Sequence, residues 1–268
     1  MAFLRKKKIH STIIPTKITA FAEIIQDMKI EICANSYQSA INAAKAGAHR
    51  IELCSELALG GITPSYGLLK KVMSDLSIPV RVLIRPRSGD FSFSDTEFEI
   101  MKENIELCKA LGVAGIVSGV LHLNNSIDIE RTHELVTLSK PMHFTFHRAF
   151  DWVKNPLEEI KKLDTIGVGS ILTSGQEITA VAGISALTTW RKSTKMTIIP
   201  GGGINANNIR VFQKYGFKEV HFSASKRVQT IETPQISMQS STHFEETEIT
   251  TSDTQKIKKC IKSLSNEN

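Results

Sequence analysis

The chain has 268 residues, of which 41% are hydrophobic and 22% charged, and it carries a formal net charge of +6. This length allows one large domain or two small ones, and the composition excludes global disorder, collagen-like and coiled-coil chains and disulfide scaffolds. No stretch approaches the roughly 18 consecutive apolar residues of a membrane-spanning helix, so no membrane partner is expected.

The positive charge is concentrated at the start of the chain. Residues 1–27 hold five basic and two acidic residues, a net charge of 5 − 2 = +3, which is half of the total of +6. Residues 226–268 are neutral, and the body between these two segments is close to neutral for its size. We therefore expect residues 1–27 to form a flexible basic extension, and the charge does not indicate a nucleic-acid partner.

The cysteines and the N-terminal segment predict a reducing compartment. The four cysteines, Cys33, Cys54, Cys108 and Cys260, are widely spaced and form no CxxC pair. No long apolar stretch or small-residue cleavage site follows the basic cluster, so no secretory signal is expected. We expect free thiols and a cytoplasmic protein.

From residue 28 onward, short β-branched runs alternate with longer amphipathic segments. The predicted strands are 29–33, 50–54, 80–85, 114–118, 143–147, 170–173, 197–200 and 219–223. The predicted helices between them are 36–46, 64–75, 95–110, 129–138, 156–164, 177–192 and 205–215. This alternation predicts parallel strands, and eight such units predict an α/β fold, a (β/α)8 TIM-like barrel formed as a single domain by residues 28–268. A doubly wound open sheet is the alternative, but no GxGxxG turn follows the first strand.

The segment 226–253 interrupts this pattern. It is rich in Ser, Thr, Gln and Glu, and a final helix is predicted after it, near 254–264. We expect 226–253 to be an irregular insertion. It is either a flexible loop or a cover over an opening or a subunit contact.

Side-chain alternation within the strands predicts a polar barrel interior. Successive strand residues point to opposite faces, and the apolar face of each strand should meet the helices. The charged residues that this alternation points inward are Glu31, Arg50, Glu52, Arg81, Arg85 and His147. Buried charges are costly unless paired, so these residues form either a Glu–Arg network that holds the strand register or a functional site.

Two polar runs follow predicted strands. In the first, Arg85 and Arg87 lie near Asp90, and two guanidinium groups can grip a carboxylate or a phosphate. In the second, His147 precedes Arg148 and Asp151, which offers an acid–base group with charged neighbours. The alternatives are a salt-bridged loop and a packed core histidine.

Small residues end the last three predicted strands. These runs are Thr173–Gly175, Gly201–Gly203 and Ser223–Ser225. Glycines permit close backbone approach, and barrels often bind phosphate at the loops after strands seven and eight. The runs therefore indicate either an anion site, with Gly201, Gly202 and Gly203 at its centre, or tight turns alone.

Cys33 and Cys54 end neighbouring predicted strands on the same inward face. Adjacent strands lie about 4.8 Å apart, so the two sulfurs can approach each other without CxxC spacing. Two thiolates are suitable soft ligands for Cu(I), and the alternative is a pair of small buried apolar residues.

These runs together resemble the CutC family of copper homeostasis proteins over residues 28–225. The matching runs are Glu31–Cys33, Arg50–Cys54, Gly60–Ser65, Ile84–Phe91, Thr145–Asp151, Leu172–Gly175 and Gly201–Gly203. The resemblance implies a (β/α)8-like barrel, a cytoplasmic homodimer and a role in copper binding or tolerance. Residues 1–27 lie outside it.

Two hypotheses of function follow. In the first, the protein is a copper homeostasis protein that binds Cu(I) through Cys33 and Cys54. In the second, it is an enzyme acting on a small phosphorylated or carboxylated metabolite. The residues expected to hold that anion are Arg85, Arg87, Asp90, Arg148 and Gly201–Gly203, and those expected to move protons are His147 with Glu31, Glu52 or Asp151. The sequence assigns no reaction class.

Overall fold

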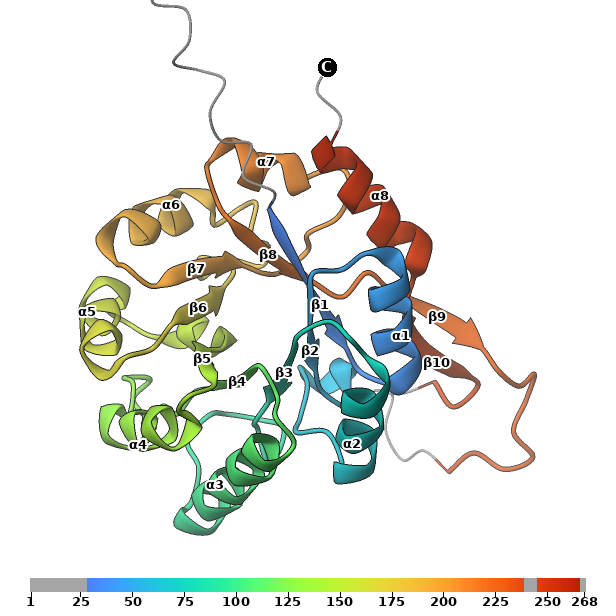
Figure 1. The fold of residues 1–268 in the computed structure, drawn as a ribbon, viewed down its shortest axis with the longest axis horizontal. Coiled ribbons are helices and arrows are strands. Elements are labelled where there is room, and N and C mark those ends of the chain that lie inside the picture. Colours follow the sequence, from blue (N-terminus) through green and yellow to red (C-terminus); the bar gives the residue numbers. More distant parts are fainter. Residues whose placement is uncertain (1–27, 239–244, 266–268) are drawn as a thin grey trace, which may run out of the picture.

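The computed structural model describes residues 28–238 and 245–265, which form the predicted (β/α)8 barrel (Figure 1). The parallel strands follow one another in chain order from β1 to β7, and β8 lies beside β1. A parallel bridge between Gly201 and His221 joins the end of β7 to β8 and closes the ring. The barrel strands are β1 (Lys29–Ala34), β2 (Arg50–Leu53), β3 (Val80–Leu83), β4 (Gly115–Ser118), β5 (His143–Phe146), β6 (Ser170–Thr173), β7 (Thr197–Pro200) and β8 (Glu219–Phe222).

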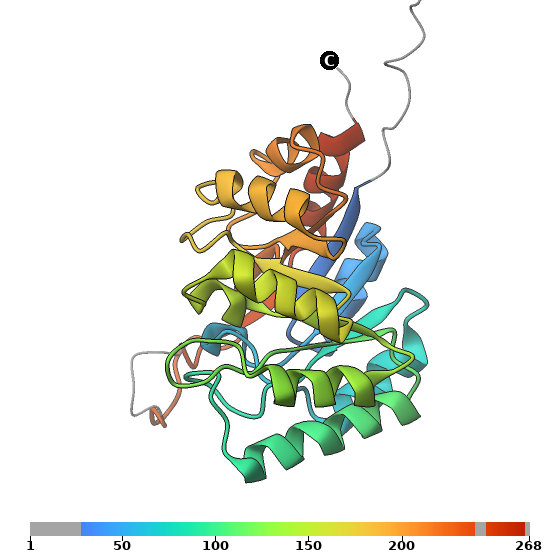
Figure 2. The ribbon, with the colours of Figure 1, turned by 90° about the vertical axis from the view of Figure 1, so that its left-hand side faces the viewer.

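Helices cover the outer face of the barrel, stacked side by side along the sheet (Figure 2). They are α1 (Tyr37–Ala46), α2 (Tyr66–Asp75), α3 (Asp95–Ala110), α4 (Ile129–Ser139), α5 (Pro156–Ile166), α6 (Ile184–Ser193), α7 (Ile209–Lys214) and α8 (Thr254–Ser265), with short 3-10 turns η1 (Leu57–Leu59) and η2 (Arg148–Trp152). The amphipathic runs bury their apolar stripes against the strands, because every strand of a parallel barrel must be covered outside. No helix among the described residues is both long and apolar enough to cross a bilayer.

The helix starts follow local capping chemistry. Ser94 accepts a hydrogen bond from the backbone of Glu97, whose side chain returns the contact to the Ser94 backbone, so α3 begins with a capping box. The side chains of Ser36 and Asp128 each accept one backbone hydrogen bond, and they cap the starts of α1 and α4 respectively. These caps place most predicted starts within two residues of the observed ones.

Two helices begin more than two residues later than predicted. The prediction placed the sixth helix from residue 177, whereas α6 begins at Ile184. The Ala180 backbone N–H donates to the Gly202 carbonyl at 2.9 Å, so this segment bonds to the β7 loop. Similarly, α7 begins at Ile209, because the Asn208 side chain accepts the Asn205 backbone N–H at 2.8 Å.

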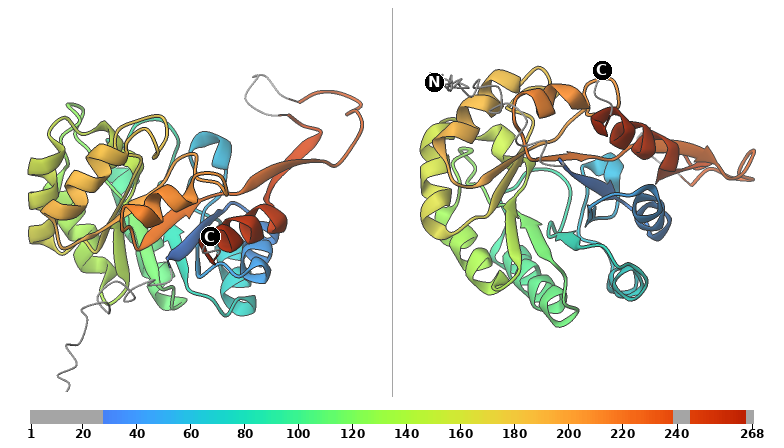
Figure 3. Two further views of the ribbon diagram at one scale, coloured as in Figure 1. Left: turned by 90° about the horizontal axis from the view of Figure 1, so that it is seen from above. Right: turned by 45° about the horizontal axis from the view of Figure 1, so that its top comes forward.

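The segment 226–253, predicted to be irregular, contains a strand near each of its ends. Strands β9 (Ser225–Gln229) and β10 (Glu248–Ser252) pair antiparallel and form a ribbon that projects from the barrel (Figure 3). Its base is fastened to α1, since the Asn42 side chain donates to the Ser252 carbonyl at 2.8 Å. The predicted basic extension, residues 1–27, lies outside the described residues.

Candidate metal and ligand site at the barrel mouth

Strand alternation places the polar residues inside the barrel as predicted. The inward-pointing charged residues are all buried, namely Glu31, Arg50, Glu52, Arg81, Arg85 and His147. Their apolar neighbours on the same strands, such as Ile30 and Ile32, pack outward in the main hydrophobic core. The barrel interior therefore carries charge where branched apolar residues are usual.

Glu31 is the centre of a buried ion-pair network. It accepts a hydrogen bond from Arg50 Nε, lies 3.6 Å from Arg81 Nη1, and contacts His221 Nδ1 at 2.8 Å. Arg50 also donates to Glu219 at 2.7 Å. Burial opposes ionisation of Glu31, but the His221 hydrogen bond and the two arginine charges hold its pKa well below the usual range. These contacts form a Glu–Arg network of the kind that was the alternative to a functional site.

His221 is a site residue that the sequence reasoning missed. It lies on β8, and its Nδ1 faces Glu31 at 2.8 Å and Glu52 at 3.7 Å. Burial lowers its pKa, but Glu52, a hydrogen bond with Cys33 and Glu31 outweigh burial and raise the pKa well above its usual value. The alternation test applied to β8 points this side chain inward, so the signal was present in the sequence.

The two strand-end thiols meet as predicted. Cys33 Sγ lies 3.7 Å from Cys54 Sγ, and both residues are buried. Cys33, Glu52 and His221 each offer a ligand atom within 4.8 Å of the others. Contact with Cys54 and burial raise the pKa of the Cys33 thiol, so it is protonated in the absence of a metal.

Gly61 explains why backbone can lie directly against this thiol pair. Its φ of +86° is left-handed, and a Cβ there would come 2.8 Å from Leu83 Cδ2 and 3.6 Å from Cys54 Sγ. Only glycine adopts this conformation without strain while leaving room for the leucine. The backbone at Gly61 therefore packs directly against the thiol pair.

A cavity of about 590 Å³ opens at the barrel mouth beside the thiols. Its wall includes the cluster of Cys33, Glu52 and His221, and also Arg85 and His147. One buried atom in each of Glu52, Arg85 and His147 has no hydrogen-bond partner among the described residues: Oε2, Nε and Nε2 respectively. Buried polar groups are ordinarily bonded, so these three atoms have hydrogen-bonding capacity that the described residues do not use.

The surroundings of His147 favour the neutral form of its ring. Burial, and then the charge of Arg85, lower its pKa to about 3. Its Nδ1 accepts the Ala149 backbone N–H at 3.3 Å, so the proton of the neutral ring lies on Nε2. The neutral ring, which lines the cavity, therefore carries an N–H donor without a partner among the described residues.

The Arg85–Asp90 run divides between two environments. Arg85 lines the cavity, but Arg87 turns away, donating to Glu97 at 2.6 Å and pairing with Asp90 at 3.2 Å. Neither Arg87 nor Asp90 is among the residues that line the cavity. This is the salt-bridged loop that was the alternative for the run.

Arg148 and Asp151 both reach the cavity wall, and they pair with each other at 2.8 Å. Asp151 also accepts the Ser174 backbone N–H at 3.0 Å and the hydroxyl of Thr173. These bonds make Asp151 a clamp between the loops after β5 and β6.

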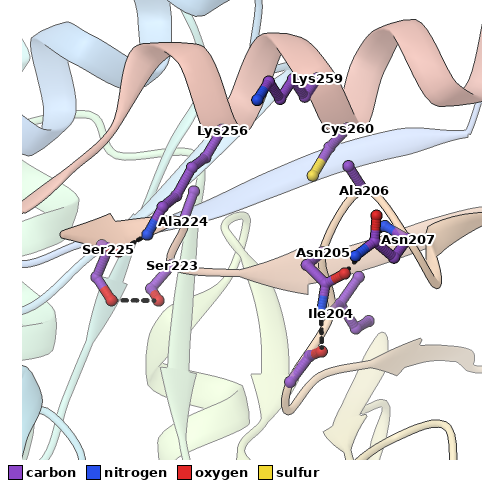
Figure 4. Close-up of a pocket in the computed structure, with 11 residues that line it drawn as sticks. Ile204, Asn205, Ala206, Asn207, Ser223, Ala224, Ser225, Lys256, Lys259 and Cys260 are labelled. Carbon is purple, nitrogen blue, oxygen red and sulfur yellow. Dashed lines mark hydrogen bonds between the residues drawn. The ribbon is translucent and has the colours of Figure 1, made fainter.

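The three glycines after β7 lie in different surroundings. Gly202 and Gly203 line the barrel-mouth cavity, while Gly201 forms the bridge to His221. Gly203 and Ser223 are shared with a second cavity of about 440 Å³, shown in Figure 4.

In this second cavity, Lys256 reaches across from α8 and donates to the Ser225 carbonyl at 2.7 Å (Figure 4). Cys260 lines the same cavity, and burial raises the pKa of its thiol to about 11. The predicted region after strands seven and eight is therefore hollowed, and the exposed Lys256 lies beside Ser225 at its edge.

Replacing His147 with Phe is expected to reduce the acid sensitivity of the fold. Because the folded pKa of His147 is about 3 and the unfolded value 6.5, the unfolded chain binds the extra proton between these pH values. Wild-type stability therefore falls as pH drops below 6.5, by about 1 kcal/mol per pH unit from this residue alone. Urea unfolding between pH 7 and 4.5 should show a shallower decline in H147F. Parallel profiles of the two proteins would contradict the neutral state of the ring.

The fold and the site define the class of this protein. It is a TIM-barrel protein with two thiols, an imidazole and a carboxylate gathered at the C-terminal ends of its strands. A more specific assignment comes from comparison with known proteins. The chain belongs to the CutC family, a copper homeostasis family, because the CutC family model matches residues 28–226.

Relatives in several bacteria share most of this barrel. A CutC protein from Enterobacter sp. (strain 638) is 44% identical over 198 residues, which cover 74% of this chain and 80% of the relative. A CutC protein from Proteus mirabilis is 42% identical over 200 residues, covering 74% and 80% respectively.

Solved structures agree on the fold. A Streptococcus agalactiae protein solved under the name copper homeostasis protein CutC has a TM-score of 0.69 and 32% identity, covering 73% of this chain and 98% of that one. Thiamine phosphate pyrophosphorylase from Pyrococcus furiosus has a TM-score of 0.55 at 13% identity, covering 89% and 96%, a similarity of fold alone.

Proposed function

We propose that this protein binds Cu(I) in the cytoplasm through the thiolates of Cys33 and Cys54. The observation that carries the proposal is the 3.7 Å separation of the two sulfurs. Metal–thiolate bonds are about 2.3 Å long for zinc, and bonds of this length let one ion contact both sulfurs. Thiolates are soft ligands and suit Cu(I), which is a soft ion.

His221 is proposed as a third donor to the same ion. Its ring shares a cluster with Cys33 and Glu52, with ligand atoms within 4.8 Å of one another. Imidazole is a good copper ligand once deprotonated, and Glu31 holds the ring at Nδ1, 2.8 Å away. Copper binding then releases protons from the thiols and the imidazolium, so affinity rises with pH.

The family resemblance also supports a homodimer. The molar mass of the purified full chain, measured by light scattering during gel filtration, tests this part of the proposal. A mass equal to that of one 29.7 kDa chain at all concentrations would exclude it.

The copper proposal is tested by single thiol replacements. Cys33→Ser and Cys54→Ser are each expected to weaken Cu(I) binding at least tenfold, or about 1.4 kcal/mol, because each removes one soft ligand. Affinity is measured anaerobically by competition with a coloured Cu(I) chelator. A rise in proton release with Cu(I) added provides a second readout.

Cys108→Ser and Cys260→Ser are matched controls. Both thiols are buried, on α3 and α8, and neither lines the barrel-mouth cavity. These variants should bind Cu(I) as the wild type does. If all four variants bind Cu(I) equally, the Cys33–Cys54 pair is not the copper site.

A further inference from the structure

Arg85 is a buried cation without a counter-ion among the described residues. It is 5% exposed, and its Nη1 donates to the carbonyls of Leu59 and Gly61 at 3.0 Å each. Its Nη2 donates to the Gly89 carbonyl at 2.7 Å. Carbonyl oxygens solvate a guanidinium but leave its charge uncompensated, and buried charges are ordinarily paired. Two of its five N–H groups remain, and Nε, which carries one of them, has no partner in the described part of the chain.

A second unpartnered donor lies on the same cavity wall. His147 is also 5% exposed, and its protonated Nε2 bonds to no described residue. Both side chains pack on Phe91, the Arg85 guanidinium at 4.8 Å from the ring centroid and the His147 ring at 4.9 Å. Two unpartnered donors in residues that line one cavity, one of them on a cationic group, suit an anionic oxygen.

The carboxylates of the cavity do not satisfy these donors. Asp151 is held by Arg148 and by the backbone of Ser174. Glu52 faces His221 at 3.7 Å, on the thiol side. The charge of Arg85 therefore stays available to a ligand.

We propose that the barrel mouth binds a small organic anion whose carboxylate or phosphate oxygens accept hydrogen bonds from Arg85 Nε and His147 Nε2. This site goes beyond the copper proposal and does not depend on it. The anion offsets the charge of Arg85 and also accepts hydrogen bonds from the two unpartnered donors. A water molecule can accept these hydrogen bonds but does not offset the charge.

The rest of the wall indicates an organic body attached to the anion. The cavity volume of about 590 Å³ lies within the range of roughly 300–1,000 Å³ for small-molecule sites. The large apolar side chains of its lining are Leu57, Leu59, Leu83, Phe91, Trp152 and Leu172. Trp152 stands edge-on to Phe91 at 5.0 Å and is 49% exposed, so an apolar ligand gains by covering it.

The test uses the full chain at constant ionic strength, with four probes. Benzoate and phenyl phosphate carry an anion on an apolar body, inorganic phosphate lacks the body, and benzyl alcohol lacks the charge. We expect benzoate or phenyl phosphate to raise the thermal midpoint, as any ligand of the native state must. Inorganic phosphate should bind more weakly, and benzyl alcohol should have no effect. Comparing the two aromatic anions distinguishes a carboxylate from a phosphate site.

Calorimetric titration of variants then locates the bound anion. Arg85→Met and His147→Phe should each weaken binding at least tenfold. Arg87→Met is the matched control from the same run, since Arg87 pairs with Glu97 outside the cavity. Lys256→Met is the control for the neighbouring cavity of Figure 4.

The outcomes are decisive in either direction. Arg85 also donates to three backbone carbonyls, so Arg85→Met can fail to fold. In that case the His147→Phe variant gives the answer, because it keeps a ring of similar size. No stabilisation by any anion, full affinity in His147→Phe, or loss of affinity only in Lys256→Met overturns the proposal. Cys54→Ser should keep the anion affinity, because Cys54 does not line this cavity, and this separates failure of the anion site from failure of the copper site.

Discussion

Replacing Glu31 with Gln is expected to lower the free energy of unfolding by about 3–5 kcal/mol, the cost of breaking a buried ion pair from one side. Glu31 is 1% exposed and contacts Arg50, Arg81 and His221. The amide keeps the shape of the side chain but removes its charge, so three cationic groups in the barrel interior lose their shared counter-ion. The remaining carboxylates, Glu219 and Glu52, lie at the edges of this network.

Chemical denaturation monitored by tryptophan fluorescence measures this effect. Glu134→Gln is the matched control, because Glu134 forms an exposed pair with Lys102 at 2.9 Å. Exposed pairs contribute about 0–1 kcal/mol, so this control should unfold as the wild type does. A Glu31→Gln protein within about 1 kcal/mol of the wild type would show that the network is not what holds the interior.

Replacing Asp151 with Ala is expected to cost about 3 kcal/mol, because bonds to a charged acceptor contribute roughly 1.5–3 kcal/mol each. Asp151 accepts from Arg148 Nε, from the hydroxyl of Thr173 and from the backbone N–H groups of Ser174 and Gln176. Its removal leaves donors in two loops unsatisfied. The effect should therefore fall on stability, measured by denaturation, whether or not the protein has a ligand.

Asp90→Ala serves as the comparison for Asp151. Asp90 has a side chain that is 55% exposed and pairs with Arg87 in the loop after β3. Its loss should change the unfolding free energy by less than about 1 kcal/mol. If Asp151→Ala instead unfolds like the wild type but no longer binds organic anions, Asp151 contacts the ligand and the clamp interpretation is wrong.

Strand alternation was the most informative part of the sequence for the site. The period of two pointed Glu31, Glu52 and both thiols into the barrel, and all four are buried there. The same rule stops working where a strand ends. Arg85 and Arg87 are two residues apart, yet β3 ends at Leu83, and only Arg85 turns to the cavity.

The projecting ribbon had a weak sequence signal. Residues 226–253 are rich in polar residues, which predict a loop when only apolar periodicity is considered. Pairing of β9 with β10 depends on backbone hydrogen bonds and on contacts with α1, such as that of Asn42 with the Ser252 carbonyl at 2.8 Å. Contacts between residues over two hundred positions apart cannot be recognised from local pattern.

The sequence by itself determined the order of strands and helices, the barrel, and the set of polar side chains that face its interior. These features follow from periods of 2 and 3.6 residues and from capping groups, all of which are local. Only the tertiary structure decided which of these side chains compensate one another. Glu31 is surrounded by cations, whereas Arg85 is surrounded by carbonyls. The reason is physical: burial makes a charge costly, and whether a partner offsets that cost depends on distances between strands and loops far apart in the chain.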